Sequence, residues 1–333
     1  MPVKSPTSRS LGERRSRHRA RALLVTAALA SGAVLGAGAL AGTAAAAPSY
    51  TFTTLNNQAD PTFNQLLGIN LDGVIAGYFG SGAQGHPNKG YLLYPSYKTK
   101  DNYVNENFPG SVQTQVTGLN DLGVSVGFYS RQNNTNGVNE NDGFYVVRGH
   151  AFHTVRFPTS NNSTPPVNQL LGVNDNYIAV GFYNDAAGNS HGYTYNINKH
   201  RFRAIKLPGK ATSNTAAAIN NRGDIAGFAT VDKVTEAFLL RSNGHFKALK
   251  VPGATSTNAF GVNDQDEVVG AYTDNANKLH GFTWTPQHGF NTVDDPNGIG
   301  ATTINGVNDF GELVGFYTDA AGNTDGMLAT PAP

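Results

Sequence analysis

The twelve residues Gly306 to Tyr317, GVNDFGELVGFY, belong to a motif that occurs six times and decides the fold of this chain. The other copies begin at Gly68, Gly118, Gly172, Ala218 and Gly261. Every copy has an asparagine at the same place, and these residues follow one another at intervals of 43 to 54 positions: Asn70, Asn120, Asn174, Asn220, Asn263 and Asn308. A period of this size indicates a solenoid, a propeller or another repeat array.

Each repeat divides into four short strand candidates. In the fifth repeat they are Thr257–Asn263, Glu267–Thr273, His280–Thr285 and a segment that begins at Phe290. Gly, Asn, Asp and Pro stand at the joints, where positive φ angles, side-chain hydrogen bonds or a missing N–H favour turns. Four strands in a repeat of about 45 residues are typical of a propeller blade.

The two ends of the chain complement each other. The sixth repeat stops at Pro331 after three strands, whereas Tyr50–Asn57 provides a spare strand ahead of the first repeat. We therefore predict an all-β, six-bladed β-propeller with four strands per blade, in which the N-terminal strand completes the last blade. The domain spans residues 48–333, with repeats that start near residues 62, 111, 163, 211, 254 and 300. An open β-array is the alternative.

Residues 1–47 are predicted to be a secretory signal peptide. Basic residues at 14–21 precede the apolar run 22–41, and Ala44–Ala47 offers small residues for cleavage. A membrane anchor is the alternative, and Arg14-Arg15 leaves both Sec and twin-arginine export open. We expect an extracellular protein with no membrane association after cleavage.

The predicted mature chain is mildly acidic. Of the 24 Lys and Arg and 23 Asp and Glu residues, seven and one fall in residues 1–47, which leaves a net charge of −5. This balance argues against a nucleic-acid partner, which needs a basic footprint. The chain has no cysteine, so a hydrophobic core must hold the fold, and roughly 285 residues suffice for one. We expect a monomer.

The repeat continues into a third strand that begins with a His-Gly/Ala-Phe pattern, and the whole resembles the HAF-repeat family of bacterial extracellular proteins. The matching residues are His191-Gly192-Tyr193, His280-Gly281-Phe282 and, more loosely, Glu236-Ala237-Phe238. The resemblance implies a secreted, β-propeller-like protein and no particular reaction. Lys89, Asp142 and Asp325 replace the histidine in three repeats, so no histidine chemistry follows from it.

The Asn-Asp-x-Gly segment is interpreted as a hairpin turn whose Asn and Asp cap their own backbone. An acidic ligand cluster is the alternative, from Asp72, Asp121, Asp175, Asp264 and Asp309. One carboxylate per blade is expected to be scattered around the ring, on the face opposite the ligand. Glycines of the next strand are expected to let neighbouring blades approach closely: Gly77, Gly127, Gly181, Gly227, Gly270 and Gly315.

Two near-identical turns, Asp185–His191 and Asp319–Asp325, have an Asp-x-x-Gly-Asn spacing similar to calcium loops. They lack the carboxylates and the bidentate Glu of an EF-hand. Polar hairpins are the favoured interpretation, calcium is the alternative, and no other cofactor is expected.

A polar residue precedes the Gly or Ala of each third strand: Lys89, Asp142, His191, Glu236, His280 and Asp325. If these side chains share one mouth of the ring, His191, His280, Glu236 and Asp325 are candidates for catalysis or metal binding. They support a secreted polysaccharide lyase or glycosidase as one hypothesis.

A second polar set lies on the first strands, three residues before the repeat begins: Gln65, Gln115, Gln169, Thr215, Asn258 and Thr303. Amides and hydroxyls near a channel entrance suit sugar hydroxyls, channel waters or one another. They support the preferred hypothesis, a non-enzymatic binding protein for an extracellular polysaccharide, cell-wall polymer or surface protein. A structural surface protein is the third hypothesis. The long loops Ser130–Asp142 and Asn161–Pro166 also differ between repeats.

Overall fold

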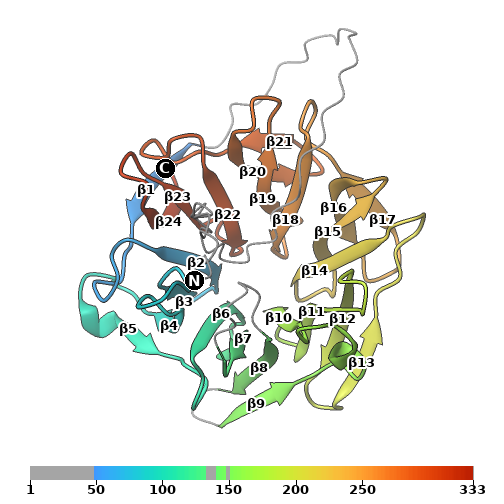
Figure 1. Cartoon of the computed structure of the whole chain (residues 1–333). Helices are drawn as coiled ribbons and strands as arrows, with labels where there is room; N and C mark the ends of the chain where they lie inside the picture. The colour runs from blue at the N-terminus through green and yellow to red at the C-terminus, as the bar shows by residue number, and fades with distance from the viewer. Residues whose placement is uncertain (1–48, 133–139, 148–150, 333) are drawn as a thin grey trace, which may run out of the picture.

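The computed structural model describes residues 49–132, 140–147 and 151–332. Six antiparallel four-stranded sheets form a ring, as Figure 1 shows, so the predicted six-bladed propeller is confirmed. The predicted signal peptide and most of the Ser130–Asp142 loop lie outside the described residues. Among the described residues, no helix has the length and apolar character needed to cross a membrane.

Each blade runs from its inner to its outer strand. Blade 1 comprises β2 (Asn64–Ile69), β3 (Ile75–Phe79), β4 (Lys89–Leu93) and β5 (Tyr103–Asn105). Blade 2 comprises β6 (Gln113–Leu119), β7 (Val124–Ser130), β8 (Asp142–Val147) and β9 (Phe152–Val155). Blade 3 comprises β10 (Asn168–Val173), β11 (Ile178–Asn184), β12 (Ser190–Asn196) and β13 (Arg201–Ala204).

Blade 4 comprises β14 (Ser213–Ile219), β15 (Ile225–Val231), β16 (Val234–Leu240) and β17 (Phe246–Leu249). Blade 5 comprises β18 (Ser256–Val262), β19 (Val268–Thr273), β20 (Leu279–Thr285) and β21 (Gly289–Thr292). Blade 6 comprises β22 (Thr302–Val307), β23 (Leu313–Thr318), β24 (Thr324–Pro331) and β1 (Tyr50–Thr54). Two 3-10 turns, η1 (Lys100–Asn102) and η2 (Ser160–Asn162), lie in loops.

The N-terminal strand closes the ring as predicted. β1 pairs antiparallel with β24, from Tyr50 opposite Pro331 to Thr54 opposite Met327. The chain end continues this contact, because the Ala332 N–H donates to the Ser49 carbonyl at 2.8 Å. The last blade is thus built from both ends of the domain and leaves no unpaired edge at β24.

The glycines of the second strands have a different role from the one expected. A Cβ at Gly181 would lie 1.9 Å from the Gln169 carbonyl oxygen of the same blade, where β10 bulges between Leu170 and Gly172. Gly181 also lies opposite the fully buried Tyr193 on β12. These glycines therefore make room within a blade, for the bulge and for the large side chain of the third strand.

Glycines of the inner strands bring the blades together instead. A Cβ at Gly68 would lie 3.2 Å from the Gly118 Cα of the next blade, and one at Gly306 would lie 3.0 Å from the Gly68 Cα. The backbones around the axis are therefore close enough for hydrogen bonds between blades.

Candidate functional site

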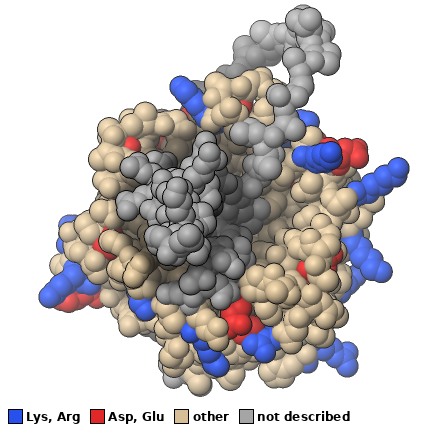
Figure 2. Space-filling model, in the orientation of Figure 1, with Lys and Arg blue, Asp and Glu red and all other residues tan. Residues whose placement is uncertain are grey.

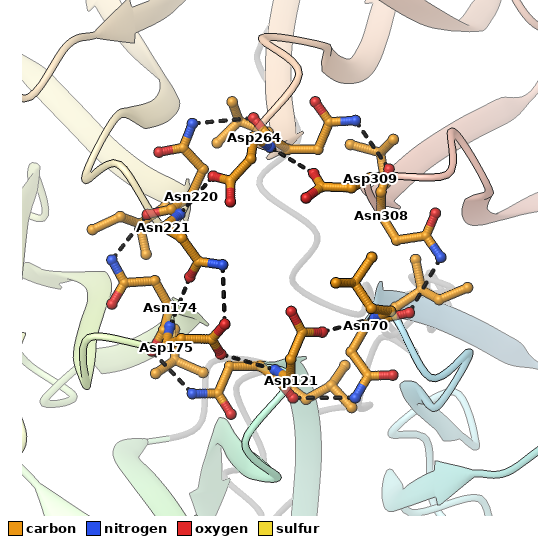
Figure 3. Close-up of a pocket in the computed structure, with 18 residues that line it drawn as sticks. Asn70, Asp121, Asn174, Asp175, Asn220, Asn221, Asp264, Asn308 and Asp309 are labelled. Carbon is orange, nitrogen blue, oxygen red and sulfur yellow. Dashed lines mark hydrogen bonds between the residues drawn. The ribbon is translucent and has the colours of Figure 1, made fainter.

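The repeated asparagines form a closed ring of hydrogen bonds around the axis (Figure 3). The side-chain amide of each asparagine donates to the backbone carbonyl of its counterpart in the next blade, at 2.9 to 3.2 Å. The circuit closes when Asn308 donates to the Asn70 carbonyl. Each side-chain oxygen also caps its own turn, as Asn70 does for the Val74 N–H. The predicted capping is confirmed for the asparagines but not for the aspartates, and the contact between blades was not foreseen.

A second ring follows at the next position of the turn. The Asp121 carboxylate accepts the Leu71 N–H at 2.7 Å, and the Asp175 carboxylate accepts the Asp121 N–H at 3.0 Å. The pattern continues through three further acceptors, Asn221, Asp264 and Asp309. Leu71 occupies the equivalent position in blade 1, so Asp72 does not belong to this ring.

These side chains line one axial cavity of about 100 Å³, so the expectation that they are scattered was wrong. The inner strands approach closely enough to bring all six turns to the axis. Among the described residues, no group of three or more His, Asp or Glu side chains is arranged to hold a metal ion. We interpret both rings as the fastening between blades.

The carboxylate of Asp121 is predicted to weaken the fold at neutral pH. Burial raises its pKa, against the Leu71 N–H, and the negative charges of Asp175 and Asp309 raise it further. A raised pKa in the folded state contributes stability at low pH that is lost as the pH rises through the folded value. Asp121→Asn should therefore increase the melting temperature by a few degrees at about pH 7, and the gain should disappear near pH 4.

Asn221 is the natural precedent for this change, since it accepts the Asp175 N–H at 2.8 Å without a charge. Thermal melts of wild type and variant at both pH values provide the measurement. A variant that is less stable at neutral pH would show that the charged hydrogen bond to Leu71 outweighs the repulsion.

The polar residues at the start of the third strands do not come together. They lie in separate blades, and each has a local partner. Asp142 pairs with Arg156, Glu236 with Lys250 at 3.2 Å, and His280 with Asp294 at 2.7 Å. Asp325 accepts the Asn56 amide at 2.6 Å, Lys89 donates to the Val112 carbonyl at 3.2 Å, and His191 contacts Asp185 at 2.8 Å. Most of these contacts join the third strand of a blade to the end of its fourth.

The surroundings of His280 favour a protonated imidazole. Burial alone would lower its pKa, but the hydrogen bonds and charges of Asp294 and Asp274 outweigh burial and raise the pKa above its usual value. An imidazole held between two carboxylates is a poor general base near neutral pH, because its proton is stabilised.

The two turns that resemble calcium loops are polar hairpins in which the Asp bonds within the turn. One Asp319 carboxylate oxygen accepts the Ala321 and Asn323 N–H groups at 2.8 Å, and the other accepts the Asn323 amide at 2.9 Å. Asp185 repeats this arrangement and also accepts His191, whose hydrogen bond contributes most to holding the pKa of Asp185 at about 2. In both turns, hydrogen bonds within the turn therefore occupy the Asp carboxylate.

The predicted ligand ring on the inner strands is largely buried. Gln65, Thr215 and Thr303 are each 2% exposed, while Gln169 and Asn258 are 6% and 7% exposed. Gln65 accepts the Tyr78 hydroxyl at 2.7 Å, and the half-buried Gln115 donates to Asn88 at 3.0 Å. Both partners lie outside the set, so these contacts do not join its members to one another. Of this set, the Gln65 amide nitrogen and the Asn258 amide oxygen are buried with no partner in the described chain.

Sequence reasoning missed a groove on the outer side of blade 1. A cavity of about 530 Å³ lies between β4, β5 and the following loop, and another of about 340 Å³ lies next to it, beside the end of β1. The two share Asn57 and Tyr103, so they lie next to each other. We call this surface the blade-1 groove, defined by Asn57, Lys89, Tyr97, Lys98, Lys100 and Tyr103. Tyr and Lys are concentrated in the segment Lys89–Tyr103, which is the signal that would have indicated it.

Comparison with known proteins gives the fold and no family. No family model matches the chain, and no curated protein matches it. Among solved structures, the putative TolB from Agrobacterium tumefaciens is similar with a TM-score of 0.55 and 10% identity, covering 86% of this chain and all of that one. The SapL1 lectin, solved with alpha methyl fucoside, has a TM-score of 0.50 and 11% identity over 78% of this chain and 89% of its own.

A streptogramin B lyase is similar with a TM-score of 0.48 and 10% identity, over 85% of this chain and 98% of its own. At this identity, the similarity to the putative TolB and to the SapL1 lectin shows the fold alone.

Proposed function

We propose that this protein is a secreted, non-enzymatic propeller of the HAF-repeat type that binds an extracellular glycan. The observation that carries the proposal is the local pairing of the predicted acid–base residues. His191, His280, Glu236 and Asp325 start third strands in four different blades, and each is engaged by a neighbour there. Glycosidic chemistry needs two carboxylates or an acid and a base on one bond, whereas binding needs only a fixed surface.

Two further features support a glycan as the ligand. The blade-1 groove combines aromatic rings with amides and lysines, which suits sugar faces and hydroxyls. Among the neighbours, the SapL1 lectin is a propeller solved with a sugar derivative. The charge of the predicted mature chain disfavours nucleic acid, and on the face shown in Figure 2 Lys and Arg are spread around the rim. The intact mass of the exported protein tests cleavage near residue 47.

Incubation with a panel of plant and microbial polysaccharides tests the proposal. Saturable retention by at least one polymer is expected, with no new reducing ends and no absorbance at about 235 nm from unsaturated products. The alternative function is a polysaccharide lyase or glycosidase. Product formation that His191→Ala or His280→Ala abolishes would establish that alternative and overturn the proposal. If no polymer in the panel is bound and none gives a product, the proposal is also overturned, and a purely structural surface protein is favoured.

A further inference from the structure

Blade 1 departs from the other blades on its outer side. Nine residues separate β4 from β5, against three to five between the corresponding strands of blades 2 to 5. This longer segment contains η1 and brings Tyr97, Lys98 and Lys100 beside the end of β1. The groove is therefore a feature of one blade, unlike the sixfold rings at the axis.

The groove presents hydrogen-bond donors and positive charge. Lys89, Lys98 and Lys100 line it, and no Asp or Glu does, although the predicted mature chain is acidic overall. The amide nitrogens of Asn57 and Asn105 have no partner in the described part of the chain, whereas their oxygens accept backbone N–H groups at 2.9 and 2.7 Å. The lining of the groove thus includes two side-chain N–H donors, whereas the amide oxygens of the same residues are occupied.

The carboxylates near the groove do not line it, and two of them accept hydrogen bonds from neighbouring side chains. Asp325 accepts the Asn56 amide, and Glu106 accepts the Ser125 hydroxyl at 2.8 Å. Asp101 belongs to η1 but does not line either cavity. Because three lysines and no carboxylate line the groove, an occupant with negative charge is favoured over a neutral or positive one.

Aromatic rings form one wall of the groove. The Tyr103 ring meets Tyr91 edge-on with centroids 5.0 Å apart, and Tyr91 stacks with Phe79 at 6.5 Å. Phenylalanine occupies the position of Tyr103 in blades 2 to 5. An aromatic side chain at this position is therefore common to these blades, whereas the hydroxyl group is found only in blade 1 among them. Burial raises the pKa of Tyr103 to about 12, so this hydroxyl remains a donor.

We infer that the blade-1 groove binds an acidic oligosaccharide, with sugar rings against the aromatic wall and carboxylates on the lysines. The inference rests on the proposed glycan-binding function and adds its site and ligand class. Both cavities fall within the range of about 300–1,000 Å³ that is usual for small-molecule sites. Because the two cavities are open and lie next to each other, together they suit several units of a chain rather than one sugar.

Titration of residues 48–333 with an oligogalacturonate, and with its methyl-esterified counterpart, tests this inference. We expect the esterified ligand to bind at least tenfold more weakly, because methyl esterification neutralises the carboxylates while it leaves the sugar rings and their hydroxyls in place. Lys98→Ala/Lys100→Ala should weaken oligogalacturonate binding about tenfold, and Tyr103→Phe about fivefold. Lys206→Ala/Lys210→Ala removes two exposed lysines from the other side of the ring and is the matched control, with unchanged affinity expected.

The possible results of this titration distinguish a wrong binding site from a wrong proposed function. Equal losses in the two lysine double variants would indicate diffuse charge attraction and overturn the inference. Unchanged oligogalacturonate binding by the groove variants would also overturn it, while leaving the proposed glycan binding intact. If the chain binds no polysaccharide of the wider panel, the proposed function itself fails. Melting curves that match wild type confirm that Tyr103→Phe retains the blade.

Discussion

Removal of residues 48–57 is expected to abolish cooperative folding. The deletion takes away β1, whose Tyr50 and Phe52 pack on the core cluster of Met327 and Ala329, and it exposes β24 as an edge. It also removes Leu55, which is 7% exposed and packs into the core of blade 1. Loss of one such buried leucine typically costs about 2–5 kcal/mol, and total stability is only about 5–15 kcal/mol. Circular dichroism melts and soluble yield provide the measurement.

A circular permutant supplies the control for this deletion. Residues 49–57 are moved behind Ala332 and joined by a copy of the Ser242-Asn243-Gly244 turn, which lies between β16 and β17 in blade 4. The antiparallel register places Pro331 opposite Tyr50, so a short turn is sufficient. The permutant should melt close to wild type. A truncated protein as stable as wild type would show that the ring does not depend on closure by β1.

Asn174→Ala is expected to cost about 2–4 kcal/mol of unfolding free energy. The side chain is 3% exposed, and its amide donates to the Asn220 carbonyl of the next blade at 2.9 Å. Its oxygen accepts the N–H groups of Asn176 and Ile178 at 3.1 Å. The substitution therefore leaves polar backbone groups of two blades without partners. Urea denaturation measures the change.

Asn176→Ala is the matched control within the same turn. Asn176 also donates to a carbonyl of blade 4, that of Asn221 at 2.8 Å, but its side chain is exposed, so water replaces the bond. Its loss should cost under about 1 kcal/mol. Equal costs for the two variants would contradict the view that the buried ring fastens the blades.

The fold could be predicted from the sequence because each repeat encodes the same local structure. Gly73 and Gly123 have φ angles of 73° and 77° at the predicted turns, as their glycine identity indicated. Ring closure followed from the spare strand at Tyr50–Asn57 and the missing one after Pro331. Both inferences use features that repeat or that complement each other along the chain.

The contacts between repeats could not be predicted in the same way. The motif predicted that Asn174 caps its own turn. The hydrogen bond from Asn174 to blade 4 could not be predicted, because it depends on how closely the backbones at Gly172 and Ala218 approach each other. Likewise, the pairing of His280 with Asp294 depends on the register of β20 and β21. The blade-1 groove depends on a single non-repeating loop, for which the sequence offered composition but no spacing rule.

A crystal structure of residues 48–333 with an oligogalacturonate tests the central claim most directly, namely that the ligand site lies in the part of blade 1 that the repeats do not share. The account predicts a sugar chain along the outer side of blade 1, with a ring against Tyr103 and carboxylates near Lys98 and Lys100. A sugar chain bound at the axis, against the inner-strand residues Gln65 and Asn258, would contradict it.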